Sequence, residues 1–168
     1  MLYLSCKWVK VDKSVNNPYY PLITMLIGEY RHNLDPKKRL AIPSKFRKEL
    51  GDGAVLTKGL DGCLFIFPLK NWAPFAEMLG GLSMGKQDTR SFARLFLSGA
   101  VDVEFDSLGR ILIPDNLKKY ANFNKEVVIA GLFNRLEIWD EARWNKYKDD
   151  LEKNSDKIAE KLGELGLI

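Results

Sequence analysis

The sequence has little of the residues that most catalytic and metal sites need. Its 168 residues include one histidine, His32, and two cysteines, Cys6 and Cys63. Two cysteines cannot build the disulfide framework of a small secreted domain, and no Cys-x-x-Cys pair is present to bind zinc. A single histidine removes most general-base and metal-centre chemistry from consideration. We therefore expect no catalytic residues, no metal and no cofactor, because the composition favours a binding protein over an enzyme.

Long hydrophobic runs are missing as well. No apolar stretch approaches the roughly 18 residues that span a bilayer, so we expect a soluble protein with no membrane partner. The two cysteines make the reducing cytoplasm the simplest compartment. A hydrophobic fraction of 46% is nevertheless enough to bury a real core. Residues 1–24 are not a good signal peptide, because Lys7 and Lys10 interrupt their apolar stretch. We predict that this segment is a peripheral extension or a misassigned start.

Positive charge is concentrated in one part of the sequence. The formal net charge of the whole chain is only +4, which is weak support for a nucleic-acid partner. Between positions 29 and 48, however, seven basic residues face two acidic ones, whereas between positions 140 and 164 six basic residues face eight acidic ones. The first stretch predicts a basic surface patch that raises the local electrostatic potential.

Two copies of one unit follow each other along the chain. At an offset of 71, Asp35 and Arg39 recur as Asp106 and Arg110, and each pair is followed by Ile-Pro. After a loop the offset becomes 72, and the matching residues of the first copy are Val55, Gly59, Leu60, Leu64, Ile66 and Trp72. Because a one-residue change confined to a loop is what a structural duplication tolerates, we interpret the matches as an internal repeat.

Each copy reads as a β-β-α-β-β-α unit. A strand with alternating apolar residues, a tight turn and a second short strand that ends at proline precede a short helix, and two more strands and a helix follow. The predicted fold class is therefore α+β. We place the copies at residues 25–79 and 100–153, with a helical connector at 80–99 and a C-terminal helix at 154–168.

The last segment of the chain has apolar residues at helical intervals, from Trp144 to Leu165. We predict one helix here, with Asn154 as the candidate position of a break. A helix that faces the core is the simpler interpretation, and a subunit interface is the alternative. Trp72 and Trp144 occupy equivalent helix positions and are expected in the core, and Cys63 is expected to be a small buried residue.

Two hairpins that each carry Asp-x-x-x-Arg followed by Ile-Pro resemble the MraZ family, whose fold is related to the AbrB swapped-hairpin DNA-binding domain. The resemblance covers Met25 to about Lys153 and rests on MLIGEYRHNLD, LDPKKRLAIP and FDSLGRILIP. It implies an AbrB-like swapped-hairpin barrel with pseudo-two-fold symmetry. One departure is Lys38, because family copies usually read Gly-Arg, as Gly109 and Arg110 do. A lysine there requires either a different turn or some strain.

The resemblance also implies a function. Family members look like sequence-specific transcriptional regulators of the bacterial division and cell-wall gene cluster, which bind tandem direct repeats in double-stranded DNA upstream of their own operon. It further implies a nucleoid-associated homo-oligomer, a ring whose neighbouring subunits meet successive repeats. The alternatives from other classes are a ring-forming scaffold and an RNA-binding protein. A scaffold would tolerate charge reversal in the first hairpin, whereas a DNA-binding protein would not.

The candidate DNA-binding residues are Arg39, Arg110, Lys38, Lys37 and Arg31. Clustered cations suit phosphate contacts and arginine suits base contacts, which favours a DNA role for Arg39. The resemblance implies the same, since the family's first motif is the one tied to DNA binding. For Arg110, an ion pair that fixes the hairpin register is an equally good interpretation.

The two motif aspartates are expected to orient the arginines. Asp35 and Asp106 lie in separate copies, and no sequence feature brings them together as an acid-base pair. Cations also follow the first hairpin, at Lys45, Arg47 and Lys48, on the predicted short helix. A solvated helix face is the ordinary explanation for these three residues, and phosphate contact is the secondary one.

Overall fold

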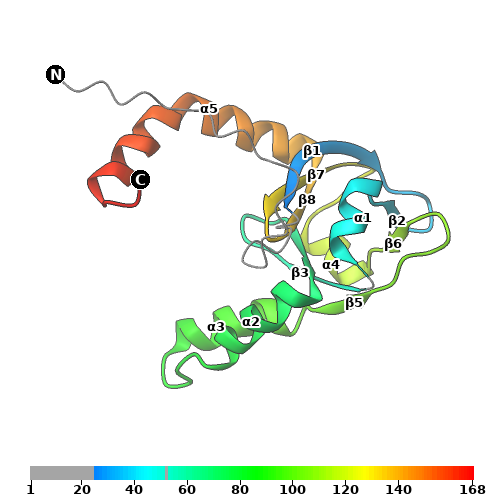
Figure 1. The fold of residues 1–168 in the computed structure, drawn as a ribbon, viewed down its shortest axis with the longest axis horizontal. Helices are drawn as coiled ribbons and strands as arrows, with labels where there is room; N and C mark the ends of the chain where they lie inside the picture. The colour runs from blue at the N-terminus through cyan, green and yellow to red at the C-terminus, as the bar shows by residue number, and fades with distance from the viewer. Residues whose placement is uncertain (1–24, 52) are drawn as a thin grey trace, which may run out of the picture.

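The computed structural model describes residues 25–51 and 53–168, so the expectation for residues 1–24 lies outside the described residues. The first copy contains β1 (Leu26–Asn33), β2 (Arg39–Ala41), α1 (Ser44–Leu50), β3 (Ala54–Lys58), β4 (Leu64–Pro68) and α2 (Leu69–Gly80). The connector is α3 (Gln87–Leu97). The second copy contains β5 (Val101–Val103), β6 (Arg110–Leu112), α4 (Asp115–Tyr120), β7 (Glu126–Phe133), β8 (Leu136–Asp140) and α5 (Glu141–Glu164). This order confirms the α+β class and the doubled unit (Figure 1).

The strands of the two copies are interleaved. Six strands form one antiparallel sheet in the order β1-β7-β8-β4-β3-β5, and β2 and β6 form a separate antiparallel pair. Pairing across the copies joins β1 to β7, β2 to β6, β3 to β5 and β4 to β8. If the equivalent strands of the two copies are exchanged, so that β1 becomes β5 and β3 becomes β7, the same four pairs result. Each copy therefore supplies strand partners that the other lacks.

The main core lies between the six-stranded sheet and the β2–β6 pair, and α1 and α4 close it. Leu40 and Ile111 are equivalent residues of the two copies and lie opposite each other in the β2–β6 register, both buried. Phe46 of α1 and Leu117 of α4 are equivalent as well, and both are fully buried. Burying side chains of this size stabilises the fold by about 1.5–3 kcal/mol each relative to exposing them. The repeated residues of the sequence thus meet in one shared core.

A second, aromatic cluster lies on the other face of β4 and β8, beneath α2 and α3. Phe65 and Phe67 alternate with residues of the main core along β4 and point into this cluster. Cys63 is buried in it, as predicted, and the cluster's low polarity raises the pKa of the thiol by desolvation. Trp72 and Trp144 pack against the cluster while keeping part of their surface exposed, so the expectation of a core position holds only in part.

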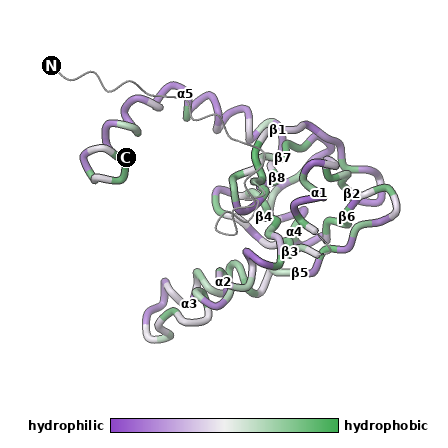
Figure 2. Tube along the Cα trace, viewed as in Figure 1, coloured by the Kyte–Doolittle hydropathy of each residue, from purple (hydrophilic) through white to green (hydrophobic). Residues whose placement is uncertain are grey.

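Helix α5 differs from its prediction in two ways. It continues through Asn154 without a break, and the Asn154 side chain donates to the Asp150 carbonyl one turn earlier at 2.8 Å. The expectation that its apolar stripe faces the core is wrong for the outer half, where Leu151 and Ile158 are 43% and 42% exposed; Leu165, directly after the end of the helix, is 64% exposed. Figures 1 and 2 show this half extending away from the body of the molecule.

No helix in the described part of the chain is long and apolar enough to cross a bilayer.

Candidate nucleic-acid interface

The first Asp-x-x-x-Arg motif forms a tight turn between β1 and β2. The backbone N–H of Lys38 donates to the Asp35 carbonyl at 2.8 Å, and the N–H of Asp35 donates to the Arg39 carbonyl at 3.0 Å. The Asp35 carboxylate accepts the backbone N–H of Arg39 at 2.9 Å and its side-chain Nε–H at 2.7 Å. The spacing of the motif thus lets one aspartate close the turn and fix the direction of the arginine that leaves it.

The second motif repeats this geometry. The Asp106 carboxylate accepts the backbone N–H of Arg110 at 3.0 Å and its Nε–H at 2.8 Å. Gly109 has a φ of +71°, and Lys38 at the equivalent position has a φ of +61°. Lys38 therefore adopts the glycine-type turn with strain, and the alternative of a different turn is wrong. A left-handed conformation costs a non-glycine residue roughly 1–2 kcal/mol.

The β2–β6 pairing brings the two motifs into one ionic cluster. Within each copy, Arg39 Nη2 lies 2.7 Å from Asp35, and Arg110 Nη2 lies 2.7 Å from Asp106. Across the copies, Arg39 Nη1 lies 3.8 Å from Asp106 and Arg110 Nη1 lies 3.6 Å from Asp35. Sequence reasoning missed this contact because it placed the aspartates in separate copies. Only the long-range register, in which Arg39 faces Leu112, closes the distance.

Hydrogen bonding in the cluster favours the ionised form of both carboxyl groups. The backbone N–H of Arg39, with help from its side chain, holds the pKa of Asp35 below its usual value. The side chain of Arg110, followed by its backbone N–H, lowers the pKa of Asp106 to about 2. At neutral pH the cluster therefore contains two cations and two anions. Both arginines are ion-paired in the structure, as the structural interpretation of Arg110 required.

Arg39 nevertheless keeps donors for a ligand. Its Nε and Nη2 atoms form a two-point contact with Asp35, whereas Nη1 has its only carboxylate neighbour in the described chain at 3.8 Å, beyond hydrogen-bond range. The side chain is 31% exposed. A guanidinium fork held on one side by a carboxylate is oriented in advance for a second contact on its other side.

The other candidate cations fall into two places. Lys37 is exposed at the tip of the first turn, and the Nζ of Lys38 forms an ion pair with Asp115 of the second copy at 2.5 Å. Arg31 is held elsewhere, because its Nε lies 3.0 Å from Glu141 at the start of α5. The structure thus brings Lys37, Lys38 and Arg39 together and ties Arg31 to the base of the C-terminal helix.

Two of the three cations on α1 are bonded to the protein itself. Lys45 donates to a β1 carbonyl at 3.0 Å. Arg47 donates to the backbone carbonyl of Ile42 at 2.9 Å and covers the second turn so closely that a Cβ on Gly109 would meet its Nη1 at 2.1 Å. The expectation of a solvated face therefore fits exposed Lys48 but not Arg47. In the sequence, the glycine at position 109 was the one feature that indicated a side chain packed closely on the second turn.

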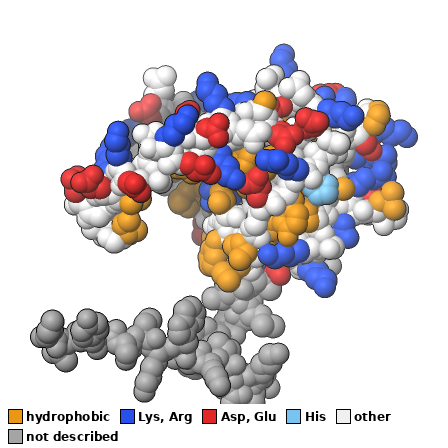
Figure 3. Space-filling view, turned by 90° about the horizontal axis from the view of Figure 1, so that it is seen from above, with side chains coloured by type: hydrophobic (Ala, Val, Ile, Leu, Met, Phe, Trp, Pro, Cys, Tyr) orange, Lys and Arg blue, Asp and Glu red, His pale blue; other side chains and the backbone are white. Residues whose placement is uncertain are grey.

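The tips of the two turns have the same shape and different chemistry. Where the first turn carries Lys37 and Lys38, the second carries Leu108 and Gly109, and Leu108 is 66% exposed. Figure 3 shows Lys and Arg side chains gathered at the end of the molecule where the two turns lie. The positive charge of this end comes from the first turn and its surroundings.

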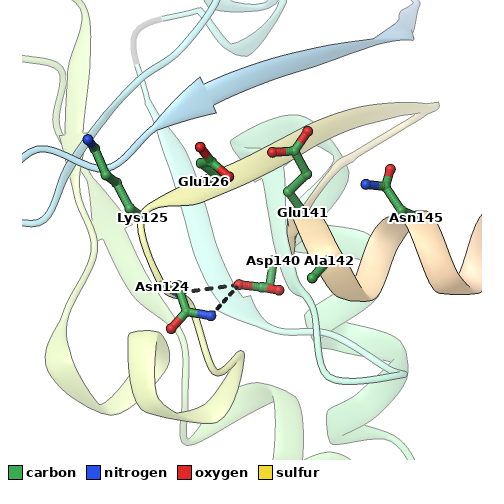
Figure 4. A pocket seen from close by; sticks show the side chains of 7 residues that line it. All are labelled: Asn124, Lys125, Glu126, Asp140, Glu141, Ala142 and Asn145. Carbon is green, nitrogen blue, oxygen red and sulfur yellow. Dashed lines mark hydrogen bonds between the residues drawn. The ribbon is translucent and has the colours of Figure 1, made fainter.

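A polar hollow of about 280 Å³ opens at the start of α5 (Figure 4). Its Asp140 accepts the backbone N–H and the side-chain amide of Asn124 at 3.3 and 3.2 Å and the backbone N–H of Arg143 at 3.3 Å. Asp140 is therefore a satisfied helix N-cap. Among the residues described, no group of three or more His, Cys, Asp or Glu side chains is placed to hold a metal ion.

Comparison with known proteins agrees with the two motifs. A family model described as "MraZ protein, putative antitoxin-like" matches twice, at residues 25–95 and 96–164. Relatives named "Transcriptional regulator MraZ" from Halothermothrix orenii, Clostridium tetani and Caldicellulosiruptor saccharolyticus are 48%, 49% and 51% identical. Each alignment spans 143 residues, which is 85% of this chain and 100% of the relative. The chain belongs to the MraZ family.

Proposed function

We propose that this protein is a sequence-specific DNA-binding transcriptional regulator that contacts double-stranded DNA through the turn of its first hairpin. Its relatives are named transcriptional regulators, which supports the regulatory role. The observation that carries the DNA surface is the grouping of exposed Lys37, of Lys38 and of the carboxylate-held Arg39 at one tip. Lysines in such a tip neutralise phosphates, and an oriented arginine reads base edges.

We take the finer features of the proposal from the resemblance to the MraZ family. The targets are tandem direct repeats upstream of the protein's own operon in the division and cell-wall gene cluster, and the protein acts at the nucleoid. Several copies form a ring, so that neighbouring first hairpins meet successive repeats and multivalency adds affinity. Asp35 and Asp106 act as positioning residues, and Arg110 supports the first hairpin through its contact with Asp35 at 3.6 Å.

The exchange-symmetric strand pairing supports a swapped-hairpin barrel of the AbrB type, with a pseudo-two-fold axis between β2 and β6. We keep residues 25–79 and 100–153 as the limits of the two repeats. The preference for DNA over RNA is supported by β4, whose Phe65 and Phe67 are buried beneath helices and are not free to stack on bases. Against a pure scaffold stands the basic first tip, which a scaffold does not require.

The test compares DNA from upstream of the protein's own operon with scrambled DNA of equal length, over a series of salt concentrations. We expect wild type to prefer the upstream DNA by roughly a thousandfold, as specific regulators do, and Arg39→Ala to lose this preference. Lys48→Ala is the matched control, because Lys48 is an exposed cation of α1 outside the turn. Equal, weak binding of both DNAs by wild type would contradict the proposal.

A further inference from the structure

Two segments extend from the body of the molecule and carry apolar side chains that the rest of the chain leaves exposed. One is the α2–α3 arm, residues 69–97, and the other is the outer half of α5, residues 149–164 (Figure 1). Salt links near the base of α5, such as Lys148 to Glu29 at 3.4 Å, hold the helix on the β1 side of the body. Its outer half is separated from the arm of the same chain (Figure 1).

The outer half of α5 has the pattern of a helix that packs against a partner. Leu151 and Ile158 of this half, and Leu165 directly after the last residue of the helix, recur at intervals of seven, which places them along one face with a slight drift. In proteins, most of the stability of a helix comes from packing its apolar face against other elements. Residues 149–164 contain six acidic and three basic side chains, so the face and its surroundings are negative.

The α2–α3 arm has the complementary character. An apolar hollow of about 200 Å³ near its outer end is lined by Leu82, Met84 and Leu97, with Arg90 and Arg94 beside them. Met84 is 80% exposed. Within the described part of the chain, neither arginine forms an ion pair, and residues 83–97 contain three basic side chains against one acidic.

We infer that the outer half of α5 of one copy packs into the α2–α3 arm of the next copy, with the apolar face of α5 over the hollow and its flanking carboxylates on Arg90 and Arg94. The two surfaces differ, so each copy donates one and accepts one. A head-to-tail contact of this kind closes into a ring when its rotation allows. The inference rests on the oligomer of the proposed function and supplies its interface.

Charge reversal tests this contact through two variants. The arm variant carries Arg90→Glu and Arg94→Glu. The helix variant carries Asp150→Lys and Glu152→Lys, because these residues adjoin Leu151 and flank its face by about 100° on either side. In light scattering at low salt we expect wild type to assemble and each variant to fall to the mass of one chain, 19.2 kDa. An equimolar mixture of the two variants should regain the wild-type mass, since each reversed surface meets its new complement.

The matched control is Asp156→Lys with Glu160→Lys, which makes the same charge change on the opposite side of α5 and should assemble normally. Circular dichroism shows whether each variant keeps its helices. Wild-type mass in either single variant, a monomeric wild type, or a mixture that stays monomeric overturns the interface. The DNA proposal fails by a different result, in which wild type assembles normally but shows no preference for the upstream DNA.

Discussion

Lys38 lies in a backbone conformation that its equivalent, Gly109, adopts without strain. Its φ of +61° brings the turn into the same shape as the second motif, and its ammonium group adds charge at the tip. The repeat aligns Lys38 with Gly109, so the sequence alone predicts a turn position that favours glycine. The sequence does not show whether Lys38 adopts the strained turn or a different one, because the outcome depends on Asp35 and Arg39 closing the turn together.

Lys38→Gly should stabilise the fold and weaken DNA binding at the same time. Relief of the left-handed strain outweighs both the greater chain entropy of glycine and a partly exposed ion pair, and we expect a gain of about 0.5 kcal/mol in the free energy of unfolding. The salt slope of DNA binding should fall by about one. Lys37→Ala is the comparison for urea unfolding, since it removes the same charge without relieving strain. A loss of stability in Lys38→Gly would contradict the strained turn.

Asp106 makes stability depend on pH in the acid range. Its folded pKa of about 2 lies below the unfolded value of about 3.9, so its contribution is complete above about pH 5 and disappears as the pH falls through 2. Denaturant unfolding between pH 5 and pH 2 should therefore show a smaller loss of stability in Asp106→Asn than in wild type. Parallel pH curves for the two proteins would show that the ion pair with Arg110 does not stabilise the fold.

At the scale of elements, local sequence patterns predicted the secondary structure, which local interactions determine. The order of strands and helices followed from alternation, proline positions and the repeat. The partners of the strands did not, because β2 pairs with β6 and β1 pairs with β7, and the paired residues are far apart in the sequence. For the same reason the four-residue ionic cluster and the cover of Gly109 by Arg47 were missed.

The stripe of α5 shows the limit of periodicity. Spacing identifies an apolar face, but it does not say whether the same chain or another copy covers that face. Trp144 packs against the aromatic cluster of its own chain, whereas Leu151 and Ile158, further along the same stripe, remain exposed.

Helix α3 is fastened to the sheet by one buried hydroxyl. Thr57 of β3 is fully buried, and its Oγ1 donates to the Phe96 carbonyl at 2.6 Å. Thr57→Val keeps the shape but removes this donor, so we expect a loss of about 1–2 kcal/mol in the free energy of unfolding. Ser91→Ala is the control, because it removes an exposed hydroxyl from the same helix, and it should change stability by less than about 0.5 kcal/mol. Equal effects of the two substitutions would show that the hydroxyl does not fasten the helix.

At the scale of the whole molecule, duplication gives two similar turns, of which one is basic and the other is not. The β2–β6 pairing holds both turns at the same end of the molecule, and the arm and α5 extend away from the body. A ring built through the arm and α5 would leave the turns free for DNA. The two copies thus share the shape of the turn, and they differ in its side-chain chemistry, which is why we propose the DNA contact for the first copy.

The most direct measurement of this assignment is the salt dependence of DNA binding after the first tip is given the residues of the second. The variant Lys37→Leu with Lys38→Gly copies Leu108 and Gly109, and its slope of log affinity against log salt should be shallower by about two. Leu108→Lys, a cation added to the second tip, should leave the slope unchanged. An unchanged slope in the first variant, or a steeper slope in the second, would contradict the claim that the first hairpin is the DNA-binding one.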